Sequence, residues 1–248
     1  MIKPTFLHPD DQPVTVGRIF GSPLVVMGIT WIPLLELAAW GILSWQTRRS
    51  KPEWSLKRSI AAGGLVSIIM FASEWCHNLA HAAVARLVRQ PVEAIRIFWG
   101  TPLLIYYDIN DRKVSPAQHR ARALGGPIFN TLMIPLCWLV RHLSGENSLA
   151  YYAADFGVKI NRIIASLSLT PLPFLDGGPI IKWSLVEKGY GIEKADEMVK
   201  YANLAFGGGL GIASCKAFKK RKHWAGAGLA ALAITSVAIG IGLLKDHE

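Results

Sequence analysis

The sequence from Ser59 to Val88 reads SIAAGGLVSIIMFASEWCHNLAHAAVARLV, and this stretch decides the fold class of the chain. It is apolar and longer than the roughly 20 residues that a helix needs to cross a hydrocarbon layer about 30 Å thick. The polar segment Glu74 to His81 interrupts it. Ionisable side chains inside a span are costly and usually mark a site or a pathway. The stretch therefore predicts a membrane helix that carries a functional centre.

The whole chain has the composition of a membrane protein. Of its 248 residues, 51% are hydrophobic and only 18% are charged, and the mean hydropathy is +0.30. Its 27 basic and 17 acidic residues give a net charge of +10. We attribute this excess to cytoplasmic loops and to anionic lipids as partners. Nucleic acid is not an expected partner, because no basic stripe with interleaved aromatic residues is present.

Six apolar stretches and one β-prone patch can be marked along the chain. The patch, Ile95–Trp99 with Leu103–Tyr107, predicts a small hairpin at the membrane face. We expect an all-α polytopic membrane protein with about six transmembrane or re-entrant helices. The fifth stretch is short and rich in glycine, so we expect it to be re-entrant. The six stretches are Leu24–Trp45, Ser59–Val88, Ala123–Val140, Phe156–Leu175, Ala202–Cys215 and Trp224–Leu244.

We expect residues 1–248 to form a single transmembrane domain with its core at 59–183. The connectors between the apolar stretches are too short for an appended soluble regulatory domain. The N-terminal residues lack the short apolar core of a secretory signal. This favours a multi-pass protein of a bacterial or archaeal cytoplasmic membrane.

Three residues of the chain could hold a metal ion. His77 and His81 lie about 40° apart on one helix face, one turn from each other, so that both imidazoles can reach one ion. Such a pair by itself is more often a helix-packing feature. A third ligand is available at Asp176, in TPLPFLDGGP (170–179), where the prolines break the helix and the glycines allow close backbone approach. Two imidazoles and one carboxylate are the protein ligands of a catalytic zinc (Zn²⁺) site, which keeps a fourth position open.

Three ordered motifs resemble those of the site-2 proteases, which are intramembrane zinc metalloproteases. The family's His-Glu-x-x-His helix corresponds to HNLAH (77–81), its Gly-Pro-x-x-Asn element to GPIFN (126–130), and its Pro-rich Leu-Asp-Gly segment to SLTPLPFLDG (168–177). The resemblance extends from about Val16 to Trp183. It implies regulated cleavage of transmembrane helices of substrate proteins, zinc bound by His77, His81 and Asp176, and a role for Asn130 in holding substrate or an oxyanion.

The chain departs from the family pattern at two positions. Asn78 stands where the family has its general base Glu, and Ser168 stands where it has Asn. An amide can orient a water molecule but cannot take its proton near neutral pH. Glu74, one turn before His77 on the same face, is a candidate substitute base or metal ligand. A carboxylate hydrogen-bonded within the helix bundle is the plainer interpretation.

Three functions remain open at this point. The first is an intramembrane zinc metallopeptidase with reduced or lost activity, and the second is a catalytically inactive pseudoprotease that binds metal and the transmembrane segments of other membrane proteins. The third is a membrane scaffold or transport protein without metal. The first requires metal and turnover, the second requires metal alone, and the third predicts neither.

Overall fold

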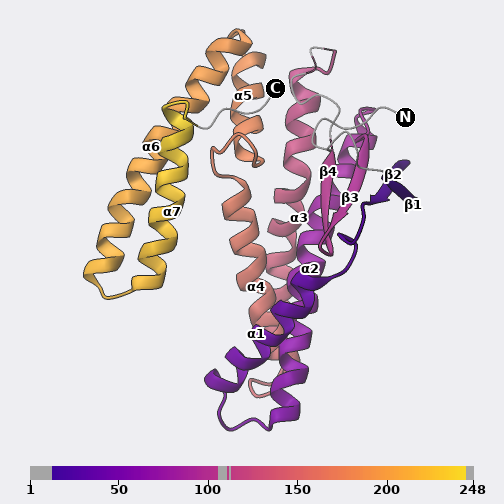
Figure 1. Cartoon of the computed structure of the whole chain (residues 1–248), viewed down its shortest axis with the longest axis vertical. Coiled ribbons are helices and arrows are strands. Elements are labelled where there is room, and N and C mark those ends of the chain that lie inside the picture. Colours follow the sequence, from indigo (N-terminus) through magenta and orange to yellow (C-terminus); the bar gives the residue numbers. More distant parts are fainter. Residues whose placement is uncertain (1–12, 106–110, 112, 244–248) are drawn as a thin grey trace. The chain divides into compact units, whose positions relative to one another are not determined.

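The computed structural model describes residues 13–105, 111 and 113–243 (Figure 1). These residues form two compact units, which are described separately. Of the described residues, the first unit comprises those before Ser115 together with Leu124–Ser166, and the second comprises Ser115–Ala123 together with those from Leu167 onward. The expectation of a single domain with its core at 59–183 stays a prediction.

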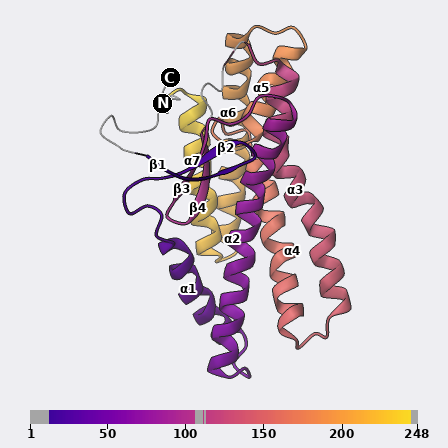
Figure 2. The ribbon, with the colours of Figure 1, turned by 90° about the vertical axis from the view of Figure 1, so that its right-hand side faces the viewer.

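Long helices make up most of the first unit. Helices α1 (Leu34–Ser50) and α2 (Leu56–Leu87) lie side by side (Figures 1 and 2). The approach is close, because a Cβ atom on Gly63 would lie 2.5 Å from the Cα of Ser44. Ser55 caps α2 by accepting a hydrogen bond from the backbone N–H of Arg58. The unit also contains most of α4 (Leu149–Ser168) and most of α3 (Pro116–Leu143).

A four-stranded sheet lies against α2 (Figure 2). Strands β3 and β4 form the antiparallel hairpin that the sequence predicts, while Tyr106 and Tyr107 lie outside the described residues. Strands β1 and β2 were not expected, and β2 pairs in parallel with β3. Trp75 of α2 donates a hydrogen bond to the carbonyl of Gly100 at the hairpin turn, at 2.8 Å. The strands are Val14–Ile19, Ser22–Val26, Ala94–Phe98 and Thr101–Ile105.

The second unit contains α5 (Gly177–Glu187) and the antiparallel pair α6 (Ile192–Lys219) and α7 (His223–Gly240) (Figure 1). Small residues let this pair pack closely, since a Cβ on Gly207 would lie 2.8 Å from Val237. The stretch expected to be re-entrant, Ala202–Cys215, is part of one continuous helix. The polar first turns of α6 lengthen it beyond the apolar residues that marked the stretch.

Within the described part of the chain, three helices are long and apolar enough to cross a membrane: α2, α3 and α7. The predicted first span is wrong at its start, because Leu24 lies in β2 and the helix begins only at Leu34, after Pro33. The fourth stretch is shifted, because α4 ends at Ser168, before the two prolines. Helix α4 also contains Asp155, which lies before the predicted stretch, pairs with Lys159 and Arg141, and makes α4 more polar than a typical span.

Candidate metal site

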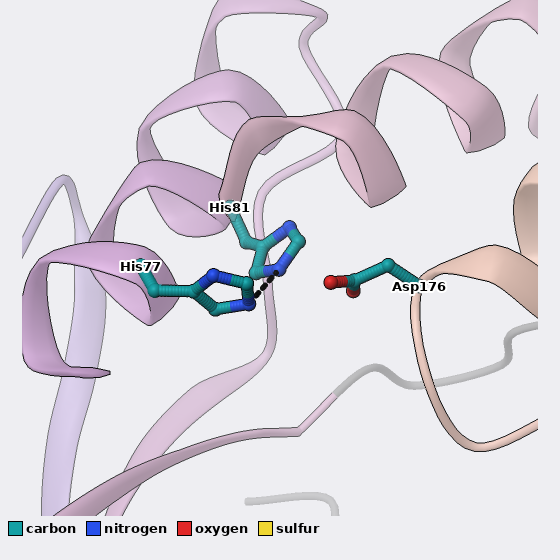
Figure 3. Close-up of side chains that lie close together, drawn as sticks. All are labelled: His77, His81 and Asp176. Carbon is teal, nitrogen blue, oxygen red and sulfur yellow. Dashed lines mark hydrogen bonds between the residues drawn. The ribbon is translucent and has the colours of Figure 1, made fainter. Parts of the chain in front are cut away.

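His77 and His81 present their imidazoles to each other on one face of α2 (Figure 3). Both side chains are buried. Their Nε2 atoms lie 3.1 Å apart, and their ring planes are inclined by 82°. Two nitrogen ligands of a tetrahedral zinc, with bonds of about 2.0–2.1 Å, lie about 3.3 Å apart. The two Nε2 atoms are hydrogen-bonded to each other, and their spacing is also close to that of two ligands of one zinc ion.

A chain of buried hydrogen bonds fixes the orientation of His77. Its Nδ1 lies 2.5 Å from Oδ1 of Asn130 on α3. The Asn130 amide donates to Oδ1 of Asn161 on α4 at 2.7 Å, so Oδ1 of Asn130 is the atom turned to the histidine. Since an amide oxygen only accepts, Nδ1 of His77 carries the hydrogen and Nε2 carries the lone pair that a metal needs.

The chain of hydrogen bonds continues to α2. Asn161 donates from Nδ2 to the hydroxyl of Ser73, at 3.1 Å, and to the carbonyl of Gly157, at 2.9 Å. Asn130, Asn161 and Ser73 are all buried. Three helices are thus tied together through side chains that end at His77, as is usual for the outer hydrogen-bond partners of metal ligands.

Two glycines let α3 approach the histidines. A Cβ on Gly125 would lie 2.8 Å from the carbonyl oxygen of Ala80, and one on Gly126 would lie 2.4 Å from Nε2 of both His77 and His81. The backbone N–H of Gly126 also points at Nδ1 of His81, at 3.3 Å. These two glycines lie within α3, which begins at Pro116, and they allow it to approach α2 this closely.

Asn78 is held by its own helix. Its Nδ2 donates to the main-chain carbonyl of Glu74 at 3.1 Å. One amide hydrogen is therefore directed along α2, while the second hydrogen and the oxygen can orient a water molecule. The side chain of Glu74 is half-buried on the same helix, one turn before His77. Its role as a base or a ligand stays a prediction.

Asp176 belongs to the second unit, where it precedes α5; its side chain is also drawn in Figure 3. It occupies the N-cap position, yet its carboxylate makes no capping hydrogen bond. The segment before it folds tightly on the two following glycines, because a Cβ on Gly177 would lie 2.2 Å from the carbonyl of Thr170. Asn203 of α6 braces the same segment by donating to the carbonyl of Pro171 at 2.7 Å.

The sequence motifs identified the histidines but not the whole of their support. Asn130 was expected to hold substrate or an oxyanion, which stays a prediction; in the structure its oxygen is directed at His77. Ser73 and the part that Asn161 plays were missed, because hydrogen bonds between residues this far apart in sequence leave no local pattern. A usable signal was present: Ser73 lies one helical turn before His77, on the same side of the helix.

Replacing Asn130 tests this support. Asn130→Ala removes the acceptor at Nδ1 of His77, and we expect zinc affinity to fall by about 10–100-fold, as for other outer-shell partners. Asn130→Asp keeps an acceptor and should retain most of the affinity. Titration of the purified protein against a fluorescent zinc chelator measures both. Ser214→Ala, which removes a buried hydroxyl bonded to Gly226, is the control; an equal loss in Ser214→Ala and Asn130→Ala would contradict the assignment.

Comparison with known proteins supports the fold more fully than the activity. No protein family model matches the sequence. The sequence is 28% identical over 71 residues to a Methanocaldococcus jannaschii protein inferred to be a zinc metalloprotease. The matched part covers 29% of this chain and 37% of that relative, so this chain spans little more than a third of it.

The structure is similar to that of a solved site-2 protease from Methanocaldococcus jannaschii. The TM-score is 0.51 at 16% sequence identity, and the superposition covers 96% of this chain and 98% of that chain. At this identity the likeness establishes the fold. The chain is therefore a polytopic helical membrane protein with a small sheet and the site-2 protease fold, as the sequence predicts.

Proposed function

We propose that the protein is a zinc-binding, site-2-protease-like intramembrane metallopeptidase with strongly reduced hydrolytic activity. The observation that carries this proposal is the histidine pair, whose Nε2 atoms are 3.1 Å apart and in which Asn130 fixes the orientation of His77. His77, His81 and Asp176 would hold the ion, and each offers one ligand atom of a kind that zinc takes.

The residues around the histidines determine how fast the site can hydrolyse a peptide bond. Zinc, when bound, supplies a Lewis acid that can acidify a coordinated water molecule toward pH 7. The chain's own contribution at the base position is an amide, Asn78, that donates to its helix and can only orient water. Absence of a general base typically costs about 10²–10⁴ in rate.

The Asn78 hydrogen bond also favours a second candidate function. A site that keeps its metal ligands and holds Asn78 against α2 is compatible with an inactive pseudoprotease that binds transmembrane segments of other membrane proteins. Both candidates share these segments as partners and a location in a cytoplasmic membrane. Turnover separates them, because the first hydrolyses a bound helix slowly and the second does not hydrolyse it at all.

The test is cleavage of fluorogenic transmembrane peptides in proteoliposomes, with binding of the same peptides measured by cross-linking. Slow cleavage that stops when 1,10-phenanthroline removes zinc supports the metallopeptidase. Cross-linking with no cleavage supports the pseudoprotease. If the protein shows no cleavage and contains no zinc, both candidate functions are contradicted, and a scaffold or transport protein is favoured.

The third metal ligand is tested separately. Asp176→Ala removes the carboxylate, and we expect zinc affinity to fall by more than the roughly 10–100-fold that loss of an outer partner costs. Asp196→Ala is the matched control, because it removes an aspartate of the same unit that pairs with Lys182 at 2.6 Å. Equal zinc affinity in the two variants, measured by competition with a chelator, would remove Asp176 from the site.

A further inference from the structure

A cavity of about 450 Å³ lies between α2, α3 and α4 in the first unit. This volume is in the range of about 300–1,000 Å³ that small-molecule sites have. We call it the apolar cavity. Its wall is formed chiefly by Leu65, Ile69, Met133, Leu136, Ala153 and Ala154.

The apolar cavity offers almost nothing to a polar ligand. Its polar side chains are Ser73 and Asn161, at the end nearest the histidines. Asn161 already accepts from Asn130 and donates to Ser73 and Gly157, so both ends of its amide are engaged. A peptide backbone or a headgroup placed here would lose its hydrogen bonds to water and gain few in return, at a cost of roughly 1–3 kcal/mol for each unpaired group.

The cavity is bordered by helices whose exposed surface is itself apolar. Two of its three helices, α2 and α3, are apolar enough to span the membrane. Leu136 and Val140 line the cavity and are about half exposed. On the same helices, Ile68 and Leu132 are large apolar residues that remain exposed. The opening is thus continuous with an apolar surface, and a nearly dry apolar interior gives water too few partners to fill it.

We propose that the apolar cavity binds one hydrocarbon chain of a membrane lipid, which enters from the side. The volume, the apolar wall and the lateral opening all suit a chain that has no hydrogen-bonding groups. The end of the bound chain covers Ser73 and Asn161, and it keeps water away from the hydrogen bonds that orient His77. Binding needs no zinc, so this inference stands apart from the proposed enzymatic function.

The test uses phosphatidylcholine with a diazirine on its acyl chain, in phosphatidylcholine vesicles that contain the full chain. After irradiation, mass spectrometry locates the adducts. We expect adducts on the cavity residues of α3 and α4. Ala154→Phe and Ala72→Phe, one in the wall and one at the exposed rim, should lower them several-fold. Leu132→Phe, on the exposed surface outside the cavity, should leave the cavity adducts unchanged. Adducts at the exposed Ile234 of α7 should be the same in all variants.

Three results would overturn the proposal. One is labelling at Ile234 with no adducts in the cavity, and another is cavity labelling that neither phenylalanine variant lowers. The third is loss of the cavity adducts when an apolar transmembrane peptide is reconstituted together with the protein in equimolar amount. That result would assign the cavity to a peptide. Zinc content is measured on the same samples. Because lipid binding needs no zinc, loss of zinc contradicts the metal site and loss of cavity labelling contradicts the lipid site.

Discussion

Asn78→Glu is expected to raise the rate of zinc-dependent peptide cleavage by about 10²–10⁴-fold, because it restores a titratable carboxylate beside the metal ligands. In the present chain the Asn78 amide donates to the Glu74 carbonyl. An ionised carboxylate cannot make that bond, and its longer side chain can instead accept the proton of a water molecule. The measurement is the cleavage rate of a fluorogenic transmembrane peptide in proteoliposomes.

Asn78→Gln is the matched control for this gain, because it has the length of glutamate and no titratable group. We expect it to remain as slow as the natural chain. Zinc-loaded Asn78→Glu that cleaves no faster than Asn78→Gln would contradict the claim that only the base is missing. Glu74→Gln answers a separate question: if it abolishes the residual activity of the natural chain, Glu74 is the substitute base.

Gly126→Ala is expected to prevent normal zinc binding although it adds a single methyl group. The new Cβ would lie 2.4 Å from Nε2 of both His77 and His81, where real Cβ atoms essentially never lie. Helix α3 or the imidazoles must therefore move, and a site loosened by about 1 Å no longer holds its ligands in productive geometry. We expect at least a tenfold loss of zinc affinity, roughly 1.4 kcal/mol, in a chelator competition assay.

Gly228→Ala provides the control for the same chemical change in an open position. Gly228 lies in α7 with no atom near its would-be Cβ, so alanine should leave zinc affinity unchanged and favour the helix slightly. Thermal unfolding of both variants shows whether Gly126→Ala also destabilises the fold. Full zinc affinity in Gly126→Ala would contradict the observed approach of α3 to the histidines.

Much of the fold could be predicted because apolar length is a local property of the sequence. Helix α2 and the β3–β4 hairpin lie close to where the pattern indicates. The first strand pair was missed because Leu24–Val26 is as apolar as the helix that follows, and only Pro33 marks the true beginning of α1. Strand pairing between residues about 70 positions apart, as between Leu24 and Ile95, leaves no local signal.

The candidate site also has a part that the sequence predicts and a part that it does not. The two histidines are one turn apart, so their common face follows directly from helix geometry. The bond between His77 and Asn130 joins residues on different helices and depends on how closely α3 approaches α2. That approach is set by Gly126, whose importance at the imidazoles is visible only once the side chains are placed.

The most direct test of the metal site is the amount of zinc per chain in protein purified in detergent, compared with a His77→Ala/His81→Ala double variant prepared identically. The account predicts about one zinc per natural chain and none in the double variant, with both proteins folded by circular dichroism. No zinc in the natural chain, or the same amount in both, would contradict it.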